Sequence, residues 1–239
     1  IGGMVGNNSS GTTSIVYGVT RDKVISLNTI LSDGSQVVFG EISQDEFDRK
    51  CGQKNLEGKL YRQAFDELNN PENREEIHAQ FPKKSIHRRN TGYAVDELLK
   101  AELFEGTEKF NFCKLLAGSE GTLAFTTEIK LSLDPIPAPV EIVVAAHFVS
   151  IHESMKSAQV AMKHPATAVE LMDKIILDCT KESIEYSKNR YFVEGDPKAL
   201  LMIEFRGKTL EEAMAKGEAL VADLKAGGYG YAYPIIEPA

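Results

Sequence analysis

The chain has 239 residues, 27 Lys and Arg against 35 Asp and Glu, a formal net charge of −8, and 42% hydrophobic residues. This length allows one large domain or two small ones with a real core. The acidic balance argues against a nucleic-acid-binding protein, whose surface is basic. No apolar run approaches the roughly 20 residues that span a bilayer, so we expect no transmembrane segment.

The three cysteines, Cys51, Cys113 and Cys179, are far apart and form no C-x-x-C pair. This pattern excludes a cysteine-only zinc or iron–sulfur site within the chain and argues against a disulfide framework. We therefore expect a cytoplasmic protein. The chain begins at Ile1 without an initiator Met and ends on the apolar run 233–239, so we expect a fragment of a longer protein.

The first 40 residues predict a glycine-rich loop followed by strands. Partial alternation over residues 24–31, the pair Asp33-Gly34 and the apolar run 37–39 are typical of a β-hairpin. Residues 43–85 then predict a helical insertion, interrupted at Asn70-Pro71. Its apolar residues recur at loosely helical spacing: Phe47, Leu56, Leu60, Phe65 and Leu68.

Residues 83–90 form a local basic run in an acidic chain. We interpret this run as a solvated loop in preference to an anion site. Residues 93–99 and 110–116 predict short helices, and alternation over 122–133 predicts a strand.

The clearest boundary lies at residues 134–139, because three prolines in five residues stiffen the chain there. After it, capping boxes at Ser150 and Thr209 each open a helix. We also predict a further helix at 173–187 and four strands, at 140–148, 168–172, 200–205 and 229–236. The order of these elements predicts a ferredoxin-like α+β arrangement.

Two glycine-rich segments are candidate binding sites. Glycines at 2–11 let a backbone approach a flat or phosphorylated ligand, and Asn8, Ser9 and Ser10 add hydrogen-bonding side chains. A tight structural turn explains this segment equally well. Residues 118–123, Gly-Ser-Glu-Gly-Thr-Leu, could wrap a polar ligand edge, although an ordinary turn into a strand is favoured for that segment alone.

Histidine and tyrosine patterns give no site. None of the five histidines, His78, His87, His147, His152 and His164, belongs to an H-E-x-x-H motif, so we predict no metal site. The alternating Tyr229, Tyr231 and Tyr233 would share one face of a strand, where sheet packing is the simpler interpretation.

Five motifs together resemble one family in order and spacing. They are Gly2-Gly3 with Asn8-Ser9-Ser10-Gly11, Tyr17-Gly18-Val19-Thr20, Asp33-Gly34, Asn90-Thr91-Gly92-Tyr93 and Gly118-Ser119-Glu120-Gly121-Thr122-Leu123. The family is the FAD-linked oxidases and dehydrogenases with a vanillyl-alcohol-oxidase (PCMH-type) flavin domain, which includes D-lactate and D-2-hydroxyglutarate dehydrogenases and the glycolate oxidase flavin subunit. The chain most resembles the long branch fused to an iron–sulfur region.

The resemblance implies an α+β fold in two parts. Residues 1–135 would be the second subdomain of a PCMH-type FAD-binding domain, with the helical insertion and without the first subdomain. Residues 140–239 would be the first half of a ferredoxin-like substrate (cap) domain.

The resemblance also implies a function. The parent protein would oxidise a D-2-hydroxy acid such as lactate, 2-hydroxyglutarate or glycolate by passing the C2 hydride to flavin N5. Electrons would leave for an iron–sulfur centre elsewhere in the parent or for another acceptor. A same-fold enzyme for another substrate (an alditol or phenol oxidase, or a cell-wall-precursor reductase) and a non-catalytic module that lost the cofactor remain alternatives. The location would be cytoplasmic, with a parent peripheral to the inner membrane also compatible.

The family's cofactor contacts carry over onto ten positions, whereas its catalytic residues carry over onto none. The ten are Gly3, Asn8, Ser9, Ser10, Gly11, Tyr17, Gly18, Glu120, Gly121 and Ile129. Ser9 and Ser10 depart from the Ala-Gly of the shorter members. We expect the isolated chain to bind FAD weakly or not at all.

Overall fold

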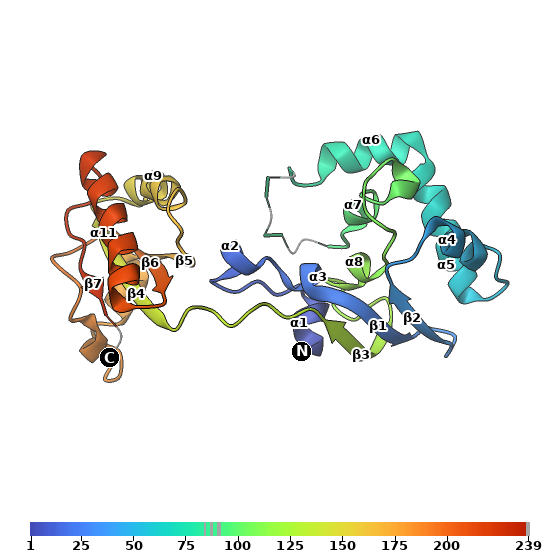
Figure 1. The fold of residues 1–239 in the computed structure, drawn as a ribbon, viewed down its shortest axis with the longest axis horizontal. Coiled ribbons are helices and arrows are strands. Elements are labelled where there is room, and N and C mark those ends of the chain that lie inside the picture. Colours follow the sequence, from blue (N-terminus) through green and yellow to red (C-terminus); the bar gives the residue numbers. More distant parts are fainter. Residues whose placement is uncertain (84, 87, 90–91, 238–239) are drawn as a thin grey trace. The chain divides into compact units, whose positions relative to one another are not determined.

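The computed structural model describes residues 1–83, 85–86, 88–89 and 92–237 (Figure 1). The chain divides into two compact units, split after Asp134. The first unit contains Ile1–Gly11 and Gly18–Asp134, and the second contains residues 12–17 and the chain from Pro135 onwards. The identification of these units with a flavin domain (1–135) and a substrate domain (140–239) stays a prediction.

A three-stranded antiparallel sheet in the order β2-β1-β3 lies in the first unit. Its strands are β1 (Val24–Ile30), β2 (Gln36–Gly40) and β3 (Phe125–Leu131). The predicted hairpin is confirmed: β1 pairs with β2, and Gly34 in the connecting turn has φ +84°, a conformation that glycine adopts without strain. Pairing of β1 with β3 brings the segment just before Phe125 back to the N-terminal part of the chain.

The helices predicted within residues 43–85 are present and end at Gln80. They are α4 (Gln44–Cys51), α5 (Leu56–Asn69) and α6 (Pro71–Gln80). Asn70 separates the last two helices, because its side-chain oxygen caps α6 by accepting the Glu72 N–H at 2.9 Å. The remaining helices of the unit are short: α1 (Gly2–Gly6), α3 (Thr20–Lys23), α7 (Val95–Leu98), a 3₁₀ turn at Glu102–Phe104 and α8 (Cys113–Leu116).

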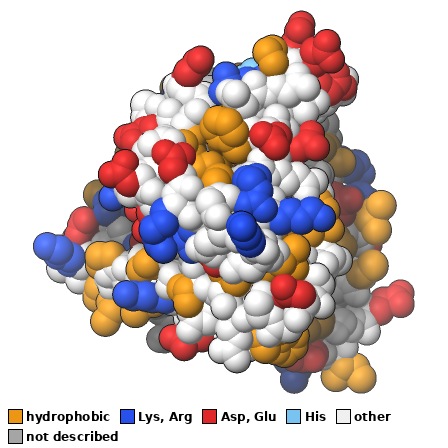
Figure 2. Space-filling view, turned by 90° about the vertical axis from the view of Figure 1, so that its right-hand side faces the viewer, with side chains coloured by type: hydrophobic (Ala, Val, Ile, Leu, Met, Phe, Trp, Pro, Cys, Tyr) orange, Lys and Arg blue, Asp and Glu red, His pale blue; other side chains and the backbone are white. Residues whose placement is uncertain are grey.

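An aromatic cluster attaches the insertion to the rest of the first unit. The rings of Phe47 and Phe110 have centroids 4.8 Å apart, as do those of Tyr61 and Phe112, and both pairs meet edge to face. Pairs of this kind contribute about 0.5–1.5 kcal/mol each beyond area burial. On the face shown in Figure 2, Lys and Arg side chains gather near the middle, with Asp and Glu around them and hydrophobic side chains between.

The second unit contains a four-stranded antiparallel sheet in the order β5-β6-β4-β7. Its elements are β4 (Val140–Phe148), α9 (Ile151–Ala161), β5 (Ala168–Asp173), α10 (Lys174–Cys179), a 3₁₀ turn at Ser187–Arg190, β6 (Ala199–Gly207), α11 (Leu210–Ala226) and β7 (Ile235–Ile236); α2 (Ser14–Tyr17) groups with them. The order β4-α9-β5-β6-α11-β7, with first and third strands adjacent in the centre, is the predicted ferredoxin-like arrangement.

Helices α9 and α11 pack on one face of this sheet and form its core. Ile142 and Phe205 from the central strands and Leu220 from α11 are fully buried there. Both predicted capping positions are confirmed. Ser150 Oγ accepts the Glu153 N–H at 3.1 Å, and the Thr209 hydroxyl caps α11 in the same way.

Three predicted elements differ from the structure. The glycine-rich start is not all loop, because residues 2–6 form α1, whose Val5 side chain is buried in the core of the first unit. The helix predicted at 173–187 ends at Cys179. Ile184, which the longer helix would have included, is 89% exposed, so its side chain would gain no apolar contact there.

The strand predicted at 229–236 is the third difference. Only Ile235–Ile236 is strand, preceded by an isolated bridge from Ala232 to His147. Gly228 and Gly230 have φ of +69° and +75°, which breaks extended geometry. The three tyrosines therefore do not share a strand face.

Candidate functional site

Two of the glycine-rich segments that the sequence singled out meet in the first unit. The last carbonyls of α1 have no partner within the helix and accept from the turn that precedes β3. Val5 O accepts the Gly118 N–H at 2.9 Å, and Gly6 O accepts the Glu120 N–H at 2.8 Å. The N-terminal segment and the 118–121 turn, more than a hundred residues apart, are thus hydrogen-bonded backbone to backbone.

The 118–121 turn depends on glycine. Gly118, Glu120 and Gly121 all have positive φ, at +94°, +55° and +70°. A Cβ added to Gly118 would lie 2.8 Å from Arg21 Nη2, so this position has no room for a side chain. Gly121 faces open space, with no atom within 4 Å of an added Cβ.

Asn8 is the buried centre of this arrangement. It is fully buried and has φ +51°, a left-handed conformation that Asn tolerates better than most residues. Its side-chain oxygen accepts the Arg21 backbone N–H at 2.7 Å. Its amide nitrogen donates to Arg89 O at 3.4 Å. The hydrogen bond to Arg21 ties a third segment, the one that follows Gly18, to the N-terminal glycine segment and the 118–121 turn.

The Arg21 side chain completes the connection. It is 5% exposed, donating from Nε to Lys114 O at 2.7 Å and from Nη2 to Ala117 O at 2.6 Å. Burial lowers its pKa, although an arginine stays protonated at neutral pH. Sequence reasoning did not single out Arg21, although it directly follows the quoted motif 17–20.

The outer side of the cluster presents backbone and small polar groups. An added Cβ on Gly3 or Gly11 would meet nothing within 4 Å, as at Gly121. Ser10 Oγ accepts a hydrogen bond from Arg88 Nε at 3.3 Å, and Ser9 Oγ donates to Asn7 Oδ1 at 2.5 Å. Uncovered glycine backbone beside hydroxyls and a cation fits a flat or phosphorylated ligand such as FAD.

The other predicted cofactor residues have structural roles or lie apart. Gly18, with φ +74°, begins the turn in which Asp22 Oδ2 accepts the Val19 N–H at 2.9 Å. Ile129 lies in β3 opposite Leu27 and packs against the core. Tyr17 belongs to the segment grouped with the second unit.

The motif at 90–93 is only partly visible, because Asn90 and Thr91 lie outside the described residues. Its last residue, Tyr93, contacts the 118–121 turn region: the Tyr93 hydroxyl and Thr122 Oγ1 are 2.7 Å apart. The fourth predicted motif therefore reaches the same part of the unit as the turn.

The basic run 83–90 is only in part a solvated loop. Lys83 and Arg88 are exposed, whereas Lys84 and His87 lie outside the described residues. Arg89 is partly buried and pairs with two acids of α7, Asp96 and Glu97; its Nη2 lies 2.9 Å from Glu97 Oε1. The interpretation as a solvated loop is wrong for Arg89.

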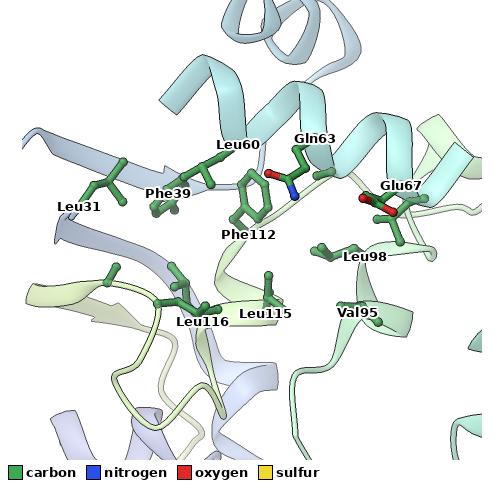
Figure 3. Close-up of a pocket in the computed structure, with 14 residues that line it drawn as sticks. Leu31, Phe39, Leu60, Gln63, Glu67, Val95, Leu98, Phe112, Leu115 and Leu116 are labelled. Atoms are coloured by element: carbon green, nitrogen blue, oxygen red, sulfur yellow. The ribbon is translucent and has the colours of Figure 1, made fainter. Parts of the chain in front are cut away.

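A separate apolar pocket of about 300 Å³ opens between α5 and the helices α7 and α8 (Figure 3). Leu60, Leu98 and Phe112 are among its walls. None of the ten predicted cofactor residues lines it, although Leu116 and Leu123 flank the 118–121 turn. Its walls are mostly hydrocarbon, so we assign no chemistry to it.

In the part of the chain that the structure describes, no group of three or more His, Cys, Asp or Glu side chains is arranged to hold a metal ion. Among the described histidines, His147 in the second unit is fully buried, with both ring nitrogens hydrogen-bonded: Nδ1 lies 2.8 Å from Ala145 O, and Nε2 accepts the Glu194 N–H at 3.0 Å. Among the described helices, none has the length and apolarity to cross a membrane.

Comparison with known proteins gives matches for both units. Residues 138–233 match the family model described as FAD linked oxidases, C-terminal domain. The chain is 30% identical over 230 residues to a D-2-hydroxyglutarate dehydrogenase of Pseudomonas putida, a match that covers 94% of this chain and 22% of that protein. It is 27% identical to the D-2-hydroxyglutarate dehydrogenases of Pantoea ananatis and Escherichia coli, in each case over 97% of this chain and 23% of the relative.

Solved structures share the fold. Two crystal structures of alkyldihydroxyacetonephosphate synthase match 98% of this chain with TM-scores of 0.50 and 0.51, at 16% identity. This chain covers 34% and 33% of those proteins. The chain has an α+β fold, and residues 138–233 resemble the C-terminal domain of FAD-linked oxidases. It spans less than a quarter of the length of the curated relatives named above.

Proposed function

We propose that this chain forms part of the flavin site of an FAD-dependent dehydrogenase that oxidises a D-2-hydroxy acid. The observation that supports this most directly is the meeting of the N-terminal glycine segment with the 118–121 turn around Asn8. Relatives that match nearly all of the chain are named D-2-hydroxyglutarate dehydrogenase, which favours this substrate class.

The residues that would face the cofactor are those with open backbone or free polar edges. Gly3, Gly11 and Gly121 allow close approach of a flat ring or a phosphate. Ser9 and Ser10 add hydroxyls, and Glu120 is an exposed residue of the 118–121 turn. Asn8 would support these residues from behind, because its side chain is used internally.

Bound FAD would accept the hydride from C2 of the substrate, leaving a 2-keto acid. In this chain we assign no residue to substrate binding or to removal of the hydroxyl proton. We propose that those residues, together with any iron–sulfur centre, lie elsewhere in a longer protein. The thiols Cys51, Cys113 and Cys179 are free among the described residues, which is compatible with a cytoplasmic location.

The test uses the full-length protein that contains this chain. Flavin content is measured by absorbance and by FAD released on denaturation. Turnover of D-2-hydroxyglutarate, D-lactate and the achiral glycolate is followed with an artificial electron acceptor, and L-2-hydroxyglutarate and L-lactate serve as controls. We expect bound FAD and selective oxidation of a D-2-hydroxy acid. Bound FAD without such turnover would overturn the substrate class, and absence of FAD binding would overturn the proposal as a whole.

The isolated chain provides a second measurement. We expect it to hold FAD weakly and to show no turnover, because we propose that the remaining cofactor contacts are made by other parts of the protein. Flavin absorbance near one equivalent per purified chain would contradict that part of the proposal.

A further inference from the structure

We propose that Arg21 is a positioning residue for the flavin site: its guanidinium bridges two carbonyls and holds the 118–121 turn against the N-terminal glycine segment. This inference rests on the proposed function. It assigns a role to a residue that the cofactor motifs themselves do not include.

The bridge is made by the two arms of one guanidinium. Nε donates to Lys114 O and Nη2 donates to Ala117 O, at 2.7 and 2.6 Å. Lys114 lies in the single turn of α8 and Ala117 is its C-terminal cap, so neither carbonyl has a partner within the helix. Arg21 therefore caps α8 immediately before the chain enters the turn at Gly118.

The same residue is held at its backbone by the other side of the site. The Arg21 N–H donates to Asn8 Oδ1 at 2.7 Å. One residue earlier, Thr20 donates both its N–H and its hydroxyl to Ser9 O, at 3.1 and 2.8 Å. The main chain and the side chain of Arg21 thus connect the N-terminal glycine segment with the end of α8 that leads into the 118–121 turn.

Gly118 shows how tightly the parts fit. Its missing side chain leaves the space that Arg21 Nη2 occupies, and Asn8 Cβ lies 3.4 Å from the same point. A methyl group at Gly118 would push on the guanidinium and on Asn8 together. The position therefore offers a second way to disturb the bridge without changing Arg21.

Lysine and glutamine can each replace only part of this arrangement. Lysine keeps the charge, but its single nitrogen lacks the planar fork that reaches two carbonyls. Glutamine is shorter and neutral. If the fork matters, R21K should restore little of what R21Q loses. If only the buried charge matters, R21K should restore most of it.

The experiment measures FAD affinity of the full-length apoprotein and of its R21Q, R21K and G118A variants at a temperature well below unfolding. Losing a hydrogen bond from a charged group predicts about tenfold or more weaker FAD binding in R21Q, with a similar loss in G118A. G34A is the matched control for G118A, because Gly34 also has a positive φ but open space at Cβ. We expect G34A to bind FAD like the unchanged protein.

A second control distinguishes positioning of the flavin site from a general loss of stability. L224A removes a fully buried side chain from the second unit and lowers stability without touching the cluster. If R21Q and G118A bind FAD as tightly as L224A and G34A do, with the same visible spectrum of the bound flavin, the inference is overturned. Failure of the unchanged protein to bind FAD would instead overturn the proposed function, so the two outcomes are distinct.

Discussion

Asn8 and Arg21 are joined by a buried hydrogen bond of 2.7 Å between the Asn8 side-chain oxygen and the Arg21 backbone N–H. The same asparagine occupies the left-handed region at φ +51°. Two requirements therefore fall on one position: tolerance of positive φ and an acceptor oxygen one carbon beyond Cβ. Among common residues, Asn and Asp meet both.

Asn8→Ala should destabilise the first unit by about 2 kcal/mol, because it leaves the buried Arg21 N–H without its acceptor and forces alanine into positive φ. The measurement is the free energy of urea-induced unfolding. Asn28→Ala is the control, since Asn28 makes an exposed hydrogen bond to Glu128 and its loss should cost at most about 0.5 kcal/mol. Equal effects of the two substitutions would contradict the buried role of Asn8.

Gly217 in α11 gives a prediction for the second unit. Alanine would raise helix propensity by about 1 kcal/mol. However, its methyl would lie 2.7 Å from Ile142 Cδ1 and 3.1 Å from Val144 Cγ2, both on fully buried side chains. Overpacking of this kind costs about 1–3 kcal/mol, so we expect a net loss of stability. Substitution of the neighbouring exposed residue, Glu218→Ala, should leave stability unchanged. A higher thermal unfolding midpoint for G217A than for E218A would contradict the close packing at Gly217.

Cys113 and Cys179 should differ in reactivity. Cys113 is buried, which raises the pKa of its thiol to about 12, and its Sγ donates to Phe39 O at 3.3 Å. Cys179 is exposed. Because the thiolate is the reactive form, maleimide at pH 7.5 should label Cys179 quickly and Cys113 only after unfolding. Mass spectrometry of digested protein after timed labelling measures both rates, and rapid labelling of Cys113 in the folded chain would contradict its burial.

Much of the fold could be predicted because its signals are local. Asn70 before Pro71, and the capping positions Ser150 and Thr209, act on their own helices and mark the same boundaries in sequence and structure. The last strand was mispredicted because positive φ at Gly230 depends on tertiary fit: an added Cβ would lie 2.9 Å from His147 O. Alternation of tyrosines carries no information about that contact.

The candidate site was likewise predictable only in part from the sequence. Glycine motifs are visible in sequence, and the structure brings the segment around Asn8 together with the 118–121 turn. Arg21 could not be assigned because its partners are backbone carbonyls 93 and 96 residues away, and every residue has a carbonyl. A role defined by main-chain partners leaves no pattern in the sequence.

His147 predicts a dependence of stability on pH. Its Nε2 accepts the Glu194 N–H, so the proton of the neutral ring is on Nδ1, which donates to Ala145 O. Burial lowers the pKa of this imidazole, against the weaker opposing effect of the Glu194 charge. Protonating Nε2 would remove the acceptor of the Glu194 N–H inside a fully buried site.

The difference in proton binding between the folded and unfolded chain determines whether stability rises or falls with pH. Because the folded-state pKa lies below the unfolded value of about 6.5, the unfolded chain binds a proton first as the pH falls. The stabilisation is complete above pH 6.5 and declines as pH falls below it, by about 1.4 kcal/mol for each unit of pKa difference. We expect the urea midpoint of the second unit to fall between pH 7.5 and 5.5. His147→Gln should be less stable at pH 7.5 but show a smaller decline, whereas His152→Gln, at an exposed position, should keep the full decline. An undiminished decline in H147Q would show that another group is responsible.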